Sequence, residues 1–369
     1  MKEYRVLTIN PGSTSTKIAY FVGKECLLSE NVAHQSDELA TFSHISEQFS
    51  YRKKVIEDFL QQQAIDATTF DAVVGRGGGL LAVGGGVYKI DNCLLTDAKN
   101  CANGVEHPAC LGPQLAAYFA EQSSCSAYVV NPPDTDEYQD LARLTGIKGH
   151  YRTSHLHALN LKETALHHAQ LMGEAYRNKN YIVCHIGGGI SVSAHRKGRI
   201  VDGIDIVGGE GPFAPTRSGS LALSTVIELI QEGYTSEDLK KFCTQTGGLV
   251  SLLGTSDARE ISEQANQGDE PSKLVWDTML YQISKTIGQM ATVLKGNVSA
   301  ILLSGGMVYN ENLVLQIKDY CEWIAPIVAY PGEFEMEAMA NGALRVLSGK
   351  EELKYYKGVP IWQPSDFPL

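Results

Sequence analysis

Glycine- and serine-rich turns follow apolar, strand-like segments at four places in the chain. These turns are residues 10–17, 75–79, 187–189 and 304–306. In the first turn, hydroxyl groups alternate with backbone N–H groups that Gly12 leaves accessible, and Lys17 adds a positive charge. Such a turn can bind phosphate oxygens, although the same residues also suit an ordinary β-hairpin turn.

Two arginines lie in glycine-rich loops. Arg76 stands among the glycines of residues 75–79, and Arg217 lies in the loop of residues 208–219, just before a helical pattern. Glycine lets a ligand approach the backbone closely, and a guanidinium binds carboxylate or phosphate with two hydrogen bonds. A structural salt bridge is the alternative for Arg76. Together with Lys17, these charges suit transfer of an anionic group better than hydride transfer or hydrolysis.

Signatures of several other enzyme classes are absent from the sequence. It contains no GxxxxGK[ST] phosphate loop, no GxGxxG after a strand, no GxSxG and no HExxH. Among the ten histidines, no pair has helical metal-site spacing with a third ligand nearby. His107, His155 and His157 lie at the ends of expected elements, where functional groups concentrate, but each also suits a structural role.

The elements that would position these groups repeat along the chain. An apolar strand, a glycine-rich turn, a second strand and a charged turn occur near residue 10 and again near residue 185, with charged turns at 23–25 and 196–198. Helical patterns follow in both halves, over residues 53–63 and 220–231. Strands alternating with helices predict an α/β protein built by duplication. Two such turns facing across a cleft could hold a nucleoside triphosphate.

Composition limits the other possibilities. The length of 369 residues predicts about two domains, and 43% hydrophobic residues exclude a disordered chain. A net charge of −11 argues against nucleic acid and anionic membrane surfaces as partners. No apolar run reaches the ~18 residues of a membrane span, and no signal peptide is visible at the N-terminus. The eight cysteines form no CxxC pair, which favours reduced thiols, so the chain is expected to be cytoplasmic.

Six strings of residues occur in an order that is typical of one family. They are INPGSTSTK from Ile9, RGG from Arg76, HIGGGISV from His185, GEGPFAPTR ending at Arg217, LLSGGMVYN at 302–310 and YPGEFEMEAMANGALRVL at 330–347. Through them, nearly the whole chain resembles the acetokinase family, and within it the enzymes that act on butyrate. That family belongs to the superfamily of acetate and sugar kinases, heat-shock chaperones and actin.

The resemblance implies a fold and an activity. The expected fold is two ribonuclease-H-like domains in the duplicated, actin-like ATPase architecture, with a central cleft. Residues 1–149 plus about 345–369 would form the N-terminal domain, and residues 150–344 the C-terminal nucleotide-binding domain. The expected reaction is direct in-line transfer of the γ-phosphoryl group of ATP, with Mg, to a short-chain carboxylate, butyrate first of all. A homo-oligomer, at least a dimer, is also implied.

The resemblance also implies roles for individual residues. The expected catalytic residues are Arg76, His107, His157 and Arg217. The expected nucleotide-binding residues are Asn10, Ser13, Ser15 and Lys17 on the first turn, His185, Gly187, Gly188 and Gly189 on the second, and Gly305 and Gly306 on the adenosine side. His157 fits the family's second histidine better than His155, because Ala158, Leu159 and Asn160 follow it.

The metal site departs from the family pattern. Glu335 falls on an acidic position implicated with Mg, but Asn131 stands where the family has an aspartate at the end of a strand. Either Asn131 binds through metal-bound water, or Asp134 or Asp136 takes the role, or activity is impaired. The expected metal residues are Asn131, Asp136 and Glu335.

Three alternatives stay open at this point. An acetate, propionate or branched-chain fatty acid kinase would keep the mechanism and change the acceptor. A sugar or polyol kinase on the same fold would need a general base for its hydroxyl acceptor. A non-catalytic, actin-like nucleotide-binding protein gains support from Asn131 and would bind ATP without transferring phosphate to any acid.

Overall fold

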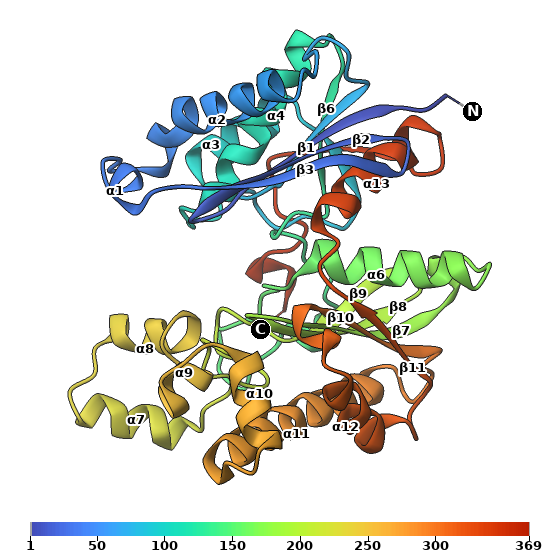
Figure 1. Ribbon diagram of the computed structural model, residues 1–369. Helices are drawn as coiled ribbons and strands as arrows, with labels where there is room; N and C mark the ends of the chain where they lie inside the picture. The colour runs from blue at the N-terminus through green and yellow to red at the C-terminus, as the bar shows by residue number, and fades with distance from the viewer. Residues whose placement is uncertain (1, 369) are drawn as a thin grey trace. The chain divides into compact units, whose positions relative to one another are not determined.

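A computed structural model describes residues 2–368, which divide into two compact units (Figure 1). Unit 1 runs to Asp136 and also contains the segment Phe334–Pro368, whereas unit 2 is the continuous stretch Glu137–Glu333. The chain passes between the units at residues 136–137 and 333–334. The domain boundaries expected from the resemblance lie at 149–150 and about 344–345, and that division stays a prediction.

Unit 1 contains a seven-stranded sheet covered by helices. Its strands, in order across the sheet, are β12 (Leu353–Tyr355), β5 (Val87–Lys89), β6 (Ser126–Val130), β4 (Ala72–Gly75), β1 (Arg5–Pro11), β2 (Ser15–Val22) and β3 (Glu25–Ala33). Its helices are α1 (Ser36–Leu39), α2 (Phe49–Gln62), α3 (Asn92–Asn100), α4 (Leu111–Gln122) and α13 (Glu335–Leu347), with 3-10 turns η1 (Ile45–Gln48), η2 (Pro108–Cys110) and η5 (Pro364–Asp366).

Strand alternation decides which helix covers which face of this sheet. Leu7, Ile9 and Val129 point to one face and are buried in the cluster that contains the apolar residues of α2 and α4. Their neighbours point to the opposite face, where Val130 packs against α13. A Cβ atom on Gly342 of α13 would lie 2.6 Å from a Val130 methyl group, so only glycine lets this helix approach the sheet so closely.

Unit 2 contains a five-stranded sheet. Its strands, in order, are β11 (Ile327–Pro331), β10 (Ala300–Gly305), β7 (Asn180–Ile186), β8 (Ile190–Arg196) and β9 (Arg199–Gly203). Its helices are α5 (Asp140–Arg143), α6 (Ala158–Leu171), α7 (Leu223–Gln231), α8 (Ser236–Thr244), α9 (Gly248–Leu253), α10 (Ala258–Asn266), α11 (Glu270–Val293) and α12 (Glu311–Cys321), with η3 (Tyr176–Asn178) and η4 (Gly306–Tyr309). No helix within residues 2–368 is both long and apolar enough to cross a membrane.

Both faces of the unit 2 sheet are buried, and the alternation of its strands shows this directly. Ile182 and Cys184 of β7 lie in the apolar cluster with α11 and α12, whereas Tyr181 and Val183 lie in a second cluster with α6. Side-chain caps start several of these helices. The Asp269 carboxylate accepts from the backbone N–H of Ser272 at the start of α11, and Asn310 accepts from Leu313 N at the start of α12.

The same topology is built in both units. In unit 1 the order β3-β2-β1-β4-β6 consists of two antiparallel pairs followed by two parallel pairs. In unit 2 the order β9-β8-β7-β10-β11 repeats it. The strand register also shifts in the corresponding pair of each unit. The shift lies at Tyr20/Phe21 between β2 and β3, and at Ala194/His195 between β8 and β9. The prediction of an α/β protein built by duplication is confirmed.

Parallel strands bring their carboxyl ends to one edge of a sheet, which is where ligands bind in such folds. In unit 1 this edge carries Asn10 near the end of β1, Arg76 after β4 and Asn131 after β6. In unit 2 it carries the segments that follow β7 and β10, which start at Gly187 and Gly306. The topology therefore gathers most of the sequence-predicted site residues at two equivalent edges.

Candidate active site

The β1–β2 turn of unit 1 is a tight hairpin. Asn10 pairs with Lys17 across the two strands, and Gly12 N donates to the carbonyl oxygen of Ser15 at 2.8 Å. Ser13 is exposed, whereas Ser15 and Lys17 are half-buried. The structure thus places all four polar residues expected to bind phosphate on one turn.

Arg52 of α2 supports this turn from inside the unit, and the sequence analysis missed it. Its guanidinium donates to the carbonyl oxygen of Gly12 at 2.8 Å and of Ser15 at 3.1 Å, and to Oγ1 of Thr16 at 2.9 Å. The side chain is fully buried, and burial lowers the pKa of Arg52 to about 10. The signal in the sequence was an arginine on the apolar stripe of a helix, at the spacing of Phe49 and Ile56.

Arg76 lies directly after β4 and is only 9% exposed. Burial lowers the pKa of its guanidinium, and the negative charges of Glu335 and Asp134 partly offset this effect. Within residues 2–368, no carboxylate forms an ion pair with Arg76. A buried guanidinium near acidic groups, yet not bonded to them, is suited to receive an anionic ligand.

His107 lies within electrostatic reach of Arg76. Its Nδ1 accepts a hydrogen bond from Ala109 N at 3.1 Å, which leaves the proton of the neutral ring on Nε2. The residue is exposed, yet partial desolvation of the ring, together with repulsion from Arg76 and Arg52, lowers the pKa of His107. At neutral pH, His107 therefore presents a neutral imidazole whose Nε2–H can donate to a ligand.

The three expected metal residues have different surroundings. Glu335 Oε2 accepts from Nδ2 of Asn10 at 2.8 Å, which ties α13 to the β1–β2 turn. Asn131, which has a φ of 37°, uses Oδ1 to accept from Gly86 N at 2.8 Å. Asp136 instead accepts from the indole Nε1 of Trp362 in the C-terminal tail at 2.8 Å. The structure therefore brings Glu335 and Asn131 to the strand-end edge and places Asp136 against the tail.

The donor set of unit 1 fits magnesium better than a transition metal. Within residues 2–368, no group of three His, Cys, Asp or Glu side chains could hold a metal ion. Magnesium, however, usually keeps several waters and binds through one or two carboxylates plus the phosphates of a substrate. Glu335, next to the β1–β2 turn, provides one such carboxylate, and the metal roles stay predictions.

Asp134 is a half-buried acid close to Arg76. Its Oδ1 accepts from Nδ2 of Asn103 at 2.7 Å, while Oδ2 is buried and has no hydrogen-bond partner. Burial raises the pKa of Asp134 to about 6. This side chain therefore costs stability at neutral pH, because its charged form lacks part of the solvation that it has in the unfolded chain.

We expect Asp134→Asn to stabilise the protein in a pH-dependent way. Between pH 4 and 6 the native state binds more protons at this position than the unfolded state, so stability falls as pH rises through that range. The variant should exceed the wild type in unfolding free energy by up to about 3 kcal/mol at pH 8, falling to about 1 kcal/mol at pH 4.5. Urea unfolding at both pH values measures this, with exposed Asp37→Asn as the control. An equal gain at both pH values would contradict the raised pKa.

The β7–β8 turn of unit 2 is lined by charged and aromatic groups. Gly187 N donates to Gly189 O at 3.2 Å, and a Cβ atom on Gly187 would lie 3.2 Å from Nε2 of His185 and 3.7 Å from Oε1 of Glu333. A Cβ atom on Gly188 would meet nothing within 4 Å. The absent side chains thus leave the turn open for a ligand. Glu333 was not predicted, since the residue singled out from this segment was Glu335.

His157, and not His155, belongs to this turn. The rings of His157 and His185 lie with centroids 4.2 Å apart at an angle of 34°. Nδ1 of His157 is 2.8 Å from Oγ of Ser191, which is fully buried in β8 and therefore orients the ring instead of acting as a nucleophile. His155 forms an ion pair with Asp205 at 3.0 Å, and 44% of its side chain is exposed.

Arg217 lies against the same turn. A Cβ atom on Gly189 would be 2.9 Å from Cζ of Arg217, so only glycine permits this contact. Nη1 donates to Ile206 O at 3.2 Å, whereas Nε is buried and has no partner. Burial lowers the pKa of Arg217, and no carboxylate of residues 2–368 forms an ion pair with it. The result is a desolvated positive charge with an unused donor.

The loop that carries Arg217 is held in place by Arg152. The Arg152 guanidinium donates two hydrogen bonds of 2.7 Å to Glu210 of this loop, one to Oε1 and one to Oε2. It also donates to Asp202 Oδ1 at 3.1 Å. Such a bidentate ion pair fixes the orientation of the two side chains and also contributes stabilising energy. Arg152 is a second positioning residue that the sequence analysis missed.

Gly305 and Gly306 lie where β10 ends. Gly305 has a φ of 103°, and its backbone exchanges hydrogen bonds of 2.9 and 3.1 Å with Gly332. A side chain on Gly305 would collide with the backbone of Ile186 at the end of β7, whereas Gly306 faces open space. The glycines therefore let the ends of β7 and β10 meet closely, beside the β7–β8 turn.

Comparisons with known proteins agree with this geometry. Residues 139–324 match the model of the acetokinase family. Butyrate kinase 2 of Clostridium acetobutylicum is 44% identical over 356 residues, which cover 96% of this chain and 100% of that protein. A probable butyrate kinase of Enterococcus faecalis is 43% identical over 359 residues, covering 97% and 99%. The crystal structure of Porphyromonas gingivalis acetate kinase, 17% identical, matches with a TM-score of 0.76, covering 93% of this chain and 100% of that one.

Proposed function

The chain belongs to the acetokinase family, and from this premise we propose that it is an ATP-dependent kinase of short-chain fatty acids. Butyrate is the proposed acceptor, because the relatives that are 40–44% identical over nearly the whole chain are butyrate kinases and probable butyrate kinases. The products are butyryl phosphate and ADP. The observation that carries this proposal is the half-buried Arg217 guanidinium beside Gly189, whose buried Nε donor has no partner.

The chemistry requires positive charge and alignment and no general base. A carboxylate is already ionised at pH 7, since such acids titrate near 4 to 5. One of its oxygens attacks the γ-phosphorus of ATP while the bond from that phosphorus to the oxygen bridging to the β-phosphate breaks. The obstacle is repulsion between the two anions, which fixed cations reduce.

The proposed roles follow from the surroundings of each group. Arg76 binds the substrate carboxylate through its fork, and the neutral His107 donates from Nε2. Arg217 donates from Nε to the transferring phosphoryl group, where negative charge is spread over three oxygens. The adjacent rings of His157 and His185 provide further donors beside the glycine turn.

The nucleotide and its metal use the remaining residues. Asn10, Ser13, Ser15 and Lys17 bind phosphate oxygens from one turn, Gly187, Gly188 and Gly189 expose the backbone of the other, and Gly305 and Gly306 lie on the adenosine side. Glu335 would hold magnesium, with Asn131 acting through a bound water and Asp136 as the least suitable of the three. Magnesium, when bound, neutralises charge on the β- and γ-phosphates. A cytoplasmic, at least dimeric enzyme stays the expectation.

A hydroxamate-trapping assay tests the proposal. The protein is incubated with ATP, magnesium and either acetate, propionate, butyrate, isobutyrate or valerate, and the acyl phosphate is captured by hydroxylamine. Product that peaks with butyrate supports the proposal and shows that Asn131 is compatible with activity. A peak with another acid would keep the mechanism and change the acceptor. Binding of ATP without product from any acid would contradict the proposal and favour a nucleotide-binding protein.

A further inference from the structure

Two cysteines that are nine positions apart in the sequence meet in unit 1. The Sγ atoms of Cys101 and Cys110 are 3.3 Å apart, and both thiols are free. Cys101 ends α3 in the left-handed conformation, with a φ of 49°, and Cys110 ends η2. The chain between them forms a loop, so the pair cannot be recognised from a short cysteine motif in the sequence. The remaining cysteines do not share this arrangement among residues 2–368.

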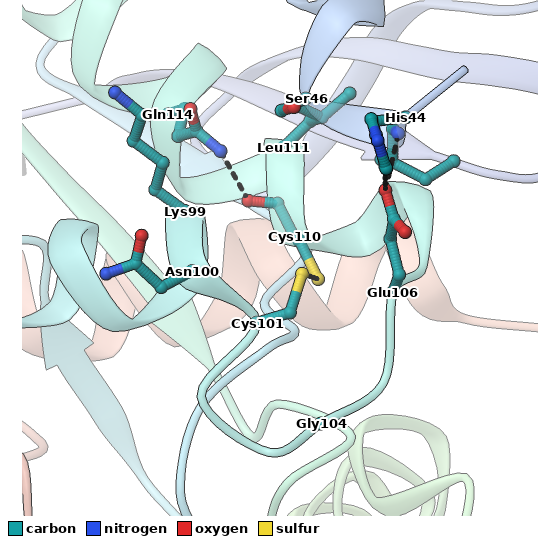
Figure 2. Close-up of a pocket in the computed structure, with 11 residues that line it drawn as sticks. His44, Ser46, Lys99, Asn100, Cys101, Gly104, Glu106, Cys110, Leu111 and Gln114 are labelled. Carbon is teal, nitrogen blue, oxygen red and sulfur yellow. Dashed lines mark hydrogen bonds and ion pairs between the residues drawn. The ribbon is translucent and has the colours of Figure 1, made fainter. Parts of the chain in front are cut away.

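A surface pocket gives access to the pair. The pocket measures about 300 Å³ and is lined by both cysteines and by Lys99, Glu106 and Gln114. Figure 2 shows the two sulfur atoms side by side at this pocket, with Nε2 of Gln114 donating to the carbonyl oxygen of Cys110 at 3.0 Å. Cys101 is half-buried, whereas Cys110 is 2% exposed. A small reagent therefore reaches Cys101 first.

The segment around Cys110 supports the loop that carries Arg76. A Cβ atom on Gly79 would lie 2.9 Å from Sγ of Cys110, and one on Gly78 would lie 2.8 Å from Cβ of Ala109. His107 also bonds to this segment, through Ala109 N. The glycine loop after β4 thus rests directly on residues 109 and 110, so a displacement there is passed on to Arg76 and His107.

We propose that Cys101 and Cys110 form a modification site at which a low-molecular-weight disulfide cross-links them and switches off the adjoining anion-binding groups. In the first step, the Cys101 thiolate attacks one sulfur of the small disulfide, forms a mixed disulfide and releases one thiolate. In the second step, the Cys110 thiolate attacks Sγ of Cys101 and releases the other. The two protein thiols are oxidised, the small disulfide is reduced, and its two thiolates take up the two protons.

A disulfide between Cys101 and Cys110 requires the two sulfur atoms to move closer together. A disulfide has its sulfur atoms about 2.05 Å apart, which is shorter than the present separation of 3.3 Å by more than 1 Å. A misplacement of about 1 Å can lower the rate of a positioned reaction by roughly a hundredfold. Burial raises the pKa of the Cys110 thiol to about 12, so its thiolate is scarce and Cys110 reacts slowly with dissolved reagents. Its attack on the mixed disulfide at Cys101 is favoured because the two Sγ atoms already lie 3.3 Å apart.

Oxidised glutathione tests the cross-link on the whole protein. After incubation and blocking of the remaining thiols, peptide mass mapping should find the peptides of Cys101 and Cys110 joined, with the loss of two hydrogen atoms. Kinase activity should fall about ten- to a hundredfold and return on treatment with dithiothreitol. Cys101→Ser and Cys110→Ala should each keep their activity in oxidised glutathione. Cys93→Ser, which removes an exposed cysteine of the same helix α3, should respond like the wild type.

Three results would overturn the inference. These are glutathione left on Cys101 without closure, modification confined to Cys26 or Cys93, and a closed cross-link that leaves activity unchanged. The mass measurement uses the unaltered chain, so misfolding of a variant cannot obscure it. It also does not depend on the enzymatic assay, so failure of the proposed function and failure of this inference are separate outcomes.

Discussion

Replacing Arg217 with alanine should lower kcat for phosphoryl transfer at least about a hundredfold. The reason is that a single pre-positioned contact to developing negative charge is worth about 3 to 4 kcal/mol in the transition state. Arg217 is suited to that contact, since its guanidinium is desolvated, lies against Gly189 and keeps Nε without a partner. The KM values for ATP and for the acid should change much less, because the lost interaction belongs to the transition state.

Two controls sharpen this test. Arg259→Ala removes an exposed arginine from α10 of the same unit and should leave kcat unchanged. Arg217→Lys keeps a positive charge but lacks the fork, so it should recover only part of the loss. Circular dichroism and thermal unfolding check that each variant folds. A tenfold or smaller loss of kcat in folded Arg217→Ala would remove the proposed role.

Replacing Arg76 with alanine should act mainly through the acid. Two charge-assisted hydrogen bonds to a carboxylate, at about 1.5 to 3 kcal/mol each, imply a loss of about 3 kcal/mol or more. We therefore expect kcat/KM for butyrate to fall at least about a hundredfold, while KM for ATP stays within about threefold. Steady-state kinetics with each substrate varied in turn measures both quantities.

The surroundings of Arg76 decide the choice of control. Its removal leaves Asp134 and Glu335 without a nearby positive charge, so the alanine variant is expected to lose some stability as well. Arg76→Lys retains that charge and should unfold like the wild type while still binding butyrate poorly. Arg5→Ala, an exposed arginine of β1, should behave normally. If KM for ATP rose as much as KM for butyrate, Arg76 would not be the carboxylate ligand.

The parts of this protein that local chemistry determines could be predicted from sequence. The turns of residues 10–17 and 187–189 can be recognised in the sequence because a β-hairpin turn needs glycine and small polar residues at fixed places. The duplicated α/β architecture follows from two similar strand–turn–strand patterns. The arginines in glycine-rich loops were visible for the same reason, since their neighbours have no side chains to occupy the space beside them.

The groups that long-range packing determines could not be predicted. Arg52 supports the first turn from a helix about forty residues away, and its spacing alone suits any amphipathic helix. Cys101 meets Cys110 only because α3 and η2 end at the same point in space. The metal role of Asp136 stays a prediction, and the sequence could not show that the indole of Trp362 donates to this carboxylate from the C-terminal tail. The choice between His155 and His157 likewise depends on Ser191 and His185, which the sequence places far away.

The discontinuity of unit 1 has a consequence for how the protein is made. A chain emerges from the ribosome with its N-terminus first, and domains tend to fold as their residues emerge. Unit 2 is continuous and can complete its sheet once residue 333 has emerged, whereas unit 1 lacks α13 and β12 until residue 355 has emerged. Until then, Val130 and its neighbours present an uncovered apolar face, and Asn10 lacks Glu335. The strands of unit 1 that precede residue 137 therefore reach their native packing only after the whole of unit 2 has been made.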